Sequence, residues 1–203
     1  MSPRLSAADR VIGLIPWVVA ALFGAVAIHL LAVLSLPALA PGASFRKLAL
    51  PLAPGEKALL PRAAAVSGGS AFADPFAALA LCRFDLAQGP LRVRASADGD
   101  HPASVSVRLA DGTIIYSAND KQTPNGKFNV LVVTQAQADA LDSAQDNTGQ
   151  TGASGGGDDE LRLVSPSARG FVLFRTLSLR AGDYEAAAAA RGGFACSVEK
   201  PAP

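Results

Sequence analysis

The sequence predicts a mainly β fold, either an antiparallel β-sandwich or a barrel-like sheet, with one or two short helices and an N-terminal transmembrane helix. A long apolar run opens the chain, short segments of alternating apolar and polar residues follow it, and Gly- or Asn-containing turns separate those segments. Alternation over a few residues is typical of half-buried strands, and a long uncharged apolar run is typical of a membrane span.

Composition limits the classes of partner. The chain has 203 residues and a formal net charge of +1, which fits one domain with additional segments. A nucleic-acid-binding protein presents a basic face that neutralises phosphates. Here the charge is near neutral and no Lys/Arg cluster is longer than Arg46-Lys47. We therefore expect no nucleic-acid partner and no electrostatic membrane patch.

Residues 11–36 predict one transmembrane helix. The run contains no Asp, Glu, Lys or Arg, and as a helix it would extend about 39 Å, more than the ~30 Å hydrocarbon core of a bilayer. A secretory signal peptide has a shorter apolar region before a small-x-small cleavage site. Residues 38–40 offer such a site, but Pro41 follows it and should fit a protease cleft poorly. We expect a retained signal-anchor, with a cleaved signal peptide as the alternative.

The charges that flank this run leave its orientation open, because two arginines precede it and Arg46 and Lys47 follow it. The cysteines favour one orientation. Cys82 and Cys196 make one candidate pair, and disulfides persist in oxidising compartments. We therefore expect residues 1–10 in the cytoplasm and the carboxyl-terminal domain outside it. The alternative is a cytoplasmic domain with two buried free thiols.

The segment after the apolar run, residues 37–73, is rich in Pro, Ala, Gly and Ser and predicts a tether. The β-rich domain then spans residues 74–203. At its start, Asp74 and Pro75 suit the N-cap and the first position of a short helix.

Two alternating segments predict the first antiparallel pair of strands. In residues 82–86 the side chains of Cys82, Phe84 and Leu86 share one face, and residues 91–95 repeat the pattern after the turn "AQGP". The alternation places Cys82 on the face directed to the core.

The middle of the domain predicts a hairpin, a central strand and a helix. An Asp-Gly turn between residues 105–109 and 114–116 is a strong hairpin signal. The apolar run at residues 128–133 predicts a central strand. Thr134, followed three residues later by Gln137, matches a capping box that opens a helix.

Residues 142–160 are of low complexity and predict a disordered surface insertion. A calcium loop spaces its acids at every second position, with a glycine at the sharp turn and a closing Glu. That spacing is absent, so no metal site is expected there. Beyond it, residues 160–166 and 170–179 predict two strands. Residues 183–191 predict a short helix that ends at Gly192-Gly193.

We expect a disulfide between Cys82 and Cys196 that fastens the end of the domain to its first strand. Closing a loop of about a hundred residues is worth roughly 4 to 5 kcal/mol in the chain-entropy model. The pairing requires Cα atoms within about 7 Å of each other.

The stretches "CRFDLAQGPLRVRA", "SVSVRLADGTIIYSAND" and "LVSPSARGFVLFRTLSL" resemble the bacterial family called domain of unknown function 1254, over roughly residues 72–196. The likeness is closest to its short, membrane-anchored members with two cysteines. The resemblance implies a β-rich domain in the periplasm, anchored in the bacterial inner membrane, with no established activity. The chain departs from the family at residues 101–104, where "HPAS" replaces an aromatic residue before the strand.

The sequence predicts no catalytic, cofactor-binding or metal site. His29, within the apolar run, is either functional or a neutral imidazole that reaches an interface or a partner helix. His101 is expected to be solvated. No nucleophile elbow surrounds Ser70. Asp85 and Asp120 follow strands, where carboxylates are ordinarily solvated or paired with Arg.

Arg83, Arg92 and Arg94 are the one concentration of charge on the predicted sheet. They either pair with acids such as Asp85 and face solvent, or they are candidate contacts for an anion or an envelope partner. The first functional hypothesis is a single-pass, inner-membrane-anchored periplasmic module that binds another envelope protein without catalysis. The alternative is an envelope hydrolase or lyase that acts through a pocket of the β domain.

Overall fold

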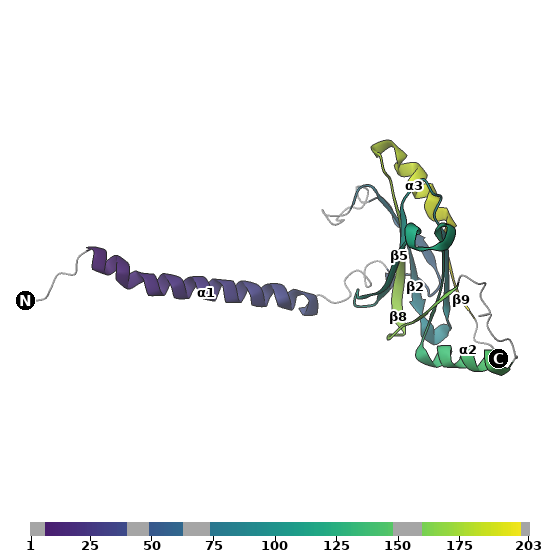
Figure 1. Ribbon diagram of the computed structural model, residues 1–203, viewed down its shortest axis with the longest axis horizontal. Coiled ribbons are helices and arrows are strands. Elements are labelled where there is room, and N and C mark those ends of the chain that lie inside the picture. The colour runs from purple at the N-terminus through teal and green to yellow at the C-terminus, as the bar shows by residue number, and fades with distance from the viewer. Residues whose placement is uncertain (1–6, 40–48, 63–73, 148–159, 200–203) are drawn as a thin grey trace, which may run out of the picture. The chain divides into compact units, whose positions relative to one another are not determined.

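The computed structural model describes residues 7–39, 49–62, 74–147 and 160–199. The chain divides into two compact units, Met1–Pro41 and Gly42–Pro203. The first contains helix α1 (Ala7–Leu39), and the second contains the strands and the other helices (Figure 1).

Helix α1 is long and apolar enough to cross a membrane. Its apolar part, Gly13–Leu36, has 24 residues and a mean hydropathy of 2.4, and it would extend about 36 Å. The helix begins before the predicted residue 11 and continues two residues beyond Pro37. Pro37 therefore lies inside the last turn, whereas the sequence placed it after the helix.

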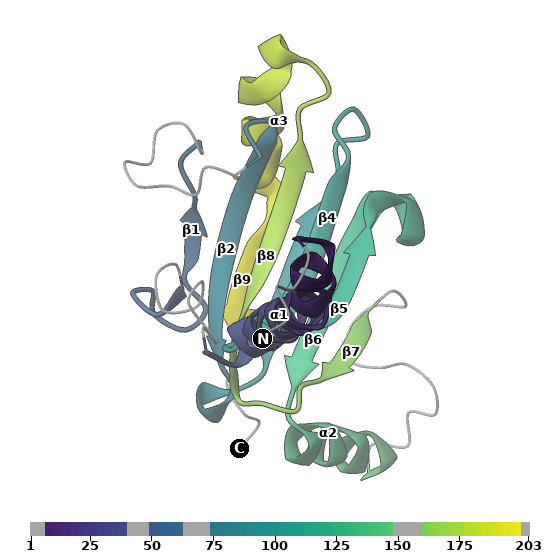
Figure 2. The same ribbon diagram turned by 90° about the vertical axis from the view of Figure 1, so that its left-hand side faces the viewer.

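The second unit is a two-layer β-sandwich with the strand orders β1-β2-β8-β4-β5 and β7-β6-β3-β9 (Figure 2). Strand pairs are antiparallel except β6 with β7. The five-stranded sheet contains β1 (Lys57–Leu59), β2 (Ala77–Asp85), β4 (Ala103–Leu109), β5 (Ile114–Asn119) and β8 (Arg169–Leu177). The four-stranded sheet contains β3 (Leu91–Ser96), β6 (Lys127–Val133), β7 (Leu161–Val164) and β9 (Ala195–Val198). The mainly β prediction is confirmed.

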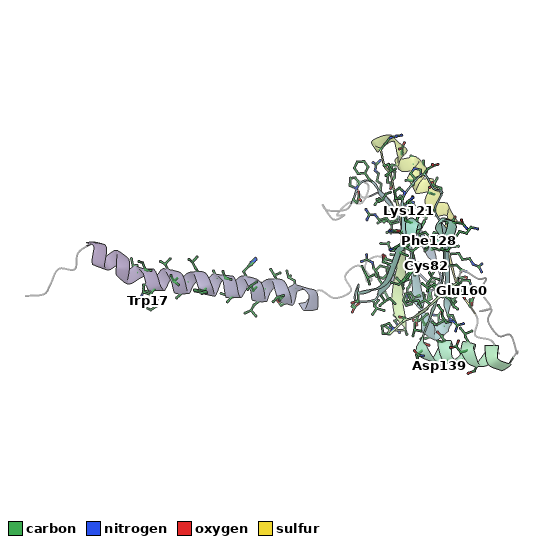
Figure 3. The ribbon with its side chains drawn as sticks, viewed as in Figure 1. Trp17, Cys82, Lys121, Phe128, Asp139 and Glu160 are labelled. Atoms are coloured by element: carbon green, nitrogen blue, oxygen red, sulfur yellow. A yellow bond between two sulfur atoms is a disulfide. The ribbon has the colours of Figure 1, made fainter. Side chains whose placement is uncertain are left out.

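The strands of both sheets alternate buried and more exposed residues. The buried side chains of the two sheets form one apolar cluster, so the core lies between the sheets. Phe174 stacks on Phe194 with ring centroids 5.4 Å apart, and Phe128 meets Phe174 edge-on at 6.1 Å. Figure 3 labels Phe128 within this layer. Such aromatic pairs add stability beyond the area that they bury.

Gly170 makes room for an aromatic ring in this core. It lies opposite Phe84 in the β2–β8 register. A Cβ atom at Gly170 would lie 2.2 Å from the carbonyl oxygen of Arg108 and 2.4 Å from Cζ of Phe84. No side chain fits there without displacing backbone or ring.

The predicted hairpin and capping box are both present. Strands β4 and β5 pair antiparallel, and Gly112 in the turn between them has φ +97°, a conformation that favours glycine. Helix α2 (Gln135–Asn147) follows β6. The Thr134 amide donates to Oε1 of Gln137, and the Gln137 amide donates to Oγ1 of Thr134.

The predicted pairing of residues 82–86 with residues 91–95 is wrong, because β2 and β3 belong to different sheets. The chain crosses between the sheets through a 3₁₀ turn, Leu86–Gln88. Gly89 then adopts φ +137°, and a Cβ there would lie 2.1 Å from the carbonyl oxygen of Glu199. The turn that sequence alone assigned to a hairpin is a crossover.

Three other boundaries differ from the sequence prediction. Asp74 caps a turn by accepting from the amide of Phe76, and β2 begins at Ala77, so the predicted helix is wrong. Within the predicted tether, Lys57–Leu59 pairs with β2, so that part of it belongs to the sheet. Helix α2 continues to Asn147, past the predicted start of the insertion at residue 142. Residues 148–159 lie outside the described residues.

The end of the chain also contains a strand that the sequence did not predict. The predicted short helix is α3 (Tyr184–Ala190), with a 3₁₀ turn, Arg191–Gly193, at its end. Strand β9 follows and pairs with β3. Cys196 therefore lies in the four-stranded sheet and not in a tail.

Candidate functional site

A disulfide joins the two sheets. Cys82 lies in β2 of the five-stranded sheet, and Cys196 lies in β9 of the four-stranded sheet. Their Cα atoms are 6.6 Å apart and 114 positions apart in the chain. Cys82, labelled in Figure 3, is fully buried. The predicted pairing is confirmed, and the bond ties the last strand across the core to the first long strand.

The structure does not bring the three predicted arginines together. Arg83 lies on β2, and its side chain alternates with the core residues Cys82 and Phe84. It therefore projects from the outer face of the five-stranded sheet. Arg92 and Arg94 alternate with core residues of β3 and project from the outer face of the other sheet. The predicted common face is wrong, because it assumed that β2 and β3 pair.

Arg83 holds a loop of its own chain. Its Nη1 donates to the carbonyl oxygens of Leu50 at 3.1 Å and Leu52 at 2.8 Å. Below this loop, Ala49 packs with Leu81 in a small apolar cluster on the outer face of the sheet. Arg83 therefore stabilises the segment that leads into β1.

Arg92 lies in an ion-pair network that connects three parts of the four-stranded sheet. Its guanidinium pairs with the carboxylates of Glu160 and Glu199. The side chains of Arg92 and Glu160 are 13% and 4% exposed, so solvent screens this pair less than a surface pair. Glu160, labelled in Figure 3, immediately precedes β7, and Glu199 follows β9. Sequence reasoning missed both acids, because they lie 68 and 107 positions from Arg92.

Beside this network lies a group of polar side chains that we call the polar patch: Arg94, Ser96, Lys127 and Asn129. In the β3–β6 register Arg94 lies opposite Asn129, and Ser96 lies opposite Lys127. All four alternate with core residues, so they project from the outer face of the sheet.

The polar patch presents unused charge and hydrogen-bonding capacity. Within the part of the chain that the structure describes, neither Arg94 nor Lys127 is in an ion pair. Oδ1 of Asn129 is buried and lacks a hydrogen-bond partner among those residues. Buried polar atoms are nearly always hydrogen-bonded. The two cations therefore make this patch suited to an acidic surface, whereas the buried Asn129 oxygen is an acceptor that a carboxylate cannot satisfy.

The remaining polar residues that the sequence singled out lie apart from the patch. Asp85 pairs with Arg169 at 3.3 Å, and Asp120 lies 3.8 Å from the amine of Lys121. His101 is not solvated as predicted, because its Nδ1 lies 2.7 Å from Oδ2 of Asp98 and its side chain is 12% exposed.

Asp98 shows opposing effects on its pKa. Partial burial acts to raise the pKa of its carboxyl group, but hydrogen bonds from the His101 side chain and backbone and from the Asp100 amide outweigh that effect. The pKa of Asp98 therefore lies below its ordinary value. The pair stabilises the loop between β3 and β4.

Among residues 7–39, 49–62, 74–147 and 160–199, no group of three or more His, Cys, Asp or Glu residues is placed to hold a metal ion. The class of protein that the structure defines is a disulfide-tied β-sandwich with an N-terminal apolar helix long enough to span a membrane.

No family model and no curated protein matches the chain. Its fold is similar to that of the VPA0106 protein from Vibrio parahaemolyticus, with a TM-score of 0.53 and 10% identity over 79% of this chain and 36% of that one. An uncharacterised protein from Burkholderia cenocepacia aligns with a TM-score of 0.34 and 13% identity, over 64% of this chain and 32% of that one. The chain thus spans about a third of each of these structures. At such identity the first shows a shared fold alone.

Proposed function

We propose that the protein is a single-pass protein of the bacterial inner membrane whose β-sandwich lies in the periplasm and binds another envelope protein without catalysis. The observation that carries the proposal is the inter-sheet disulfide in a chain that opens with helix α1. Disulfides persist outside the reducing cytoplasm. Helix α1 would attach the protein to the membrane. The disulfide favours the orientation in which the sandwich lies on the oxidising side.

Membership in the family called domain of unknown function 1254 is part of the same proposal. The three stretches that carry the resemblance form β2 with β3, β4 with β5, and β7 with β8. They therefore cover all or part of six of the nine strands that the structure describes, while β1, β6 and β9 lie outside them. The similarity of fold to one part of a longer Vibrio protein fits a domain that also occurs within larger chains.

The polar patch is the proposed contact surface, with Arg94 at its centre. Arg83 and Arg92 are occupied by contacts within the chain, whereas Arg94 is exposed. An exposed guanidinium beside an amide fits a carboxylate-bearing partner, because Arg donates to a carboxylate through two parallel bonds. The partner class is thus an envelope protein with an acidic surface.

Affinity purification of the tagged full chain from intact membranes tests this function. Arg94→Glu should remove a co-purifying protein that the unaltered chain retains, because it reverses the charge at the contact. Lys121→Glu is the matched control, since its side chain is 85% exposed and it is not one of the four patch residues. Equal recovery of partners by all three chains, or recovery of none, would contradict the proposal.

A further inference from the structure

Strand β5 differs from the other strands that end a sheet. An edge strand exposes unpaired backbone groups, and proteins ordinarily protect it by short length, charge, bulges or covering segments. Strand β5 has six residues, Ile114–Asn119, with no charged residue and no proline. Among described residues its only partner is β4, and Ile114 is 51% exposed.

The other three edges are shorter and better protected. Strand β1 has three residues and begins with Lys57. Strand β7 has four, and Arg162 within it pairs with Asp142 of α2. Strand β9 also has four, and the turn at Gly55 lies against it, since a Cβ on Gly55 would be 3.2 Å from the Val198 nitrogen. The edge of β5 is therefore the longest uncharged edge among the described strands, although its pairing with β4 contains one register shift.

One hydrogen bond shows which backbone groups of β5 point away from β4. The Asn119 amide donates to Oε1 of Gln122, in the turn that follows the strand, so it faces the free edge. Backbone groups alternate in direction along a strand. Ser117, two residues earlier, therefore also directs its N–H and C=O to the free edge, while Tyr116 and Ala118 direct theirs to β4.

This arrangement is complementary to itself. If two β5 strands meet antiparallel about a twofold axis at Ser117, each Ser117 N–H donates to the carbonyl oxygen of the other Ser117. The same register places Tyr116 opposite Ala118 on the inner face. Because β5 is uncharged, the twofold brings no like charges together. The β4–β5 register shifts at Ile115, between Tyr116 and Ile114, and the Asn119 amide is bonded to Gln122, so the two Ser117 residues make the backbone hydrogen bonds of this contact.

We propose that a second copy of this chain docks on β5, so that the two five-stranded sheets become one continuous sheet across a twofold axis. Most soluble homodimers have such self-complementary interfaces. Pairing along one short strand buries little area, so the contact is weak by itself. Attachment of both copies to one membrane, which rests on the proposed function, raises their effective concentration.

Thiol cross-linking in intact membranes tests the register. The native cysteines are bonded to each other, so an introduced cysteine is the one free thiol among the described residues. In the full chain, Ser117→Cys should give a covalent dimer under mild oxidation, because hydrogen-bonded partners have Cα atoms about 5.5 Å apart, within disulfide range. Ser106→Cys is the matched control. Ser106 lies opposite Ser117 on β4, and two copies of it would be about 15 Å apart.

The proposal expects dimer from Ser117→Cys several-fold above that from Ser106→Cys. Equal dimer from both cysteines, or none from either, overturns it. If Ser117→Cys instead cross-links to a different protein, the proposal that a second copy binds β5 is wrong. Failure here leaves the location and the Arg94 contact of the proposed function unaffected, since a reporter fusion and co-purification measure those separately.

Discussion

Removing the disulfide should cost a large part of the stability of the sandwich. In the chain-entropy model, a bond between residues 114 positions apart lowers the entropy of the unfolded chain by about 16 cal/mol/K, or about 4.8 kcal/mol at 25 °C. A domain of ordinary stability has roughly 5 to 15 kcal/mol in total. The double variant Cys82→Ala with Cys196→Ala avoids leaving a buried free thiol at position 82.

The assay is urea unfolding of the full chain in detergent, read by brief proteolysis of the unfolded domain. With a dependence of about 2 kcal/mol per molar urea, a loss of 4.8 kcal/mol moves the midpoint down by roughly 2 M. Trp17 lies in α1, so tryptophan fluorescence would not report on the sandwich.

Reductant provides the matched control. It should lower the midpoint of the unaltered chain by a similar amount and leave the double variant unchanged. A shift below about 0.5 M on removal of the bond would show that the disulfide adds little stability, because the chain-entropy contribution for so long a loop is several times larger.

Three further changes test individual contacts. Gly170→Ala should lower stability by about 1 to 3 kcal/mol or more through overpacking, whereas Gly182→Ala, which meets nothing within 4 Å, should change the urea midpoint little. Thr134→Ala should cost about 1 kcal/mol by removing the cap of α2, seen as faster amide exchange in its first turn. Because the folded-state pKa of Asp98 is lowered from 3.8, its contribution is present above that pH and is lost as pH falls below it. Asp98→Asn should therefore flatten the acid limb of a plot of melting temperature against pH.

Local signals predicted the elements that local chemistry determines. The Asp-Gly turn predicted the β4–β5 hairpin, and Thr134 with Gln137 predicted the start of α2, because each device acts within four residues. Alternation placed Cys82 and Phe84 on the core face correctly. The apolar run predicted α1 because a membrane span is defined by length and hydropathy.

Strand pairing was predicted less well, because alternation is the same whether two neighbouring strands pair or cross between sheets. Alternation therefore predicted a hairpin over residues 82–95. The predicted common face of Arg83, Arg92 and Arg94 depended on that hairpin, so it was wrong as well. Strands β1 and β9 have three and four residues, too few to show a period. Each forms a strand because it pairs with a longer strand, β1 with β2 and β9 with β3.

The polar patch and the Arg92 network depend on register between distant strands. Arg94 and Asn129 come together only in the β3–β6 pair, and Glu199 reaches Arg92 only because β9 pairs with β3. No sequence spacing indicates either contact. The disulfide could be predicted because two cysteines allow one pairing.

The proposed location of the disulfide-tied sandwich, outside the cytoplasm and attached through α1, can be measured directly. Two fusions to the full chain after Pro203 measure this directly: an enzyme that is active only after export, and a protein that fluoresces only when it folds in the cytoplasm. If the sandwich lies in the periplasm, the enzyme fusion should be active and the fluorescent-protein fusion should be dark. An inactive enzyme fusion together with a fluorescent second fusion would show that the domain lies in the cytoplasm.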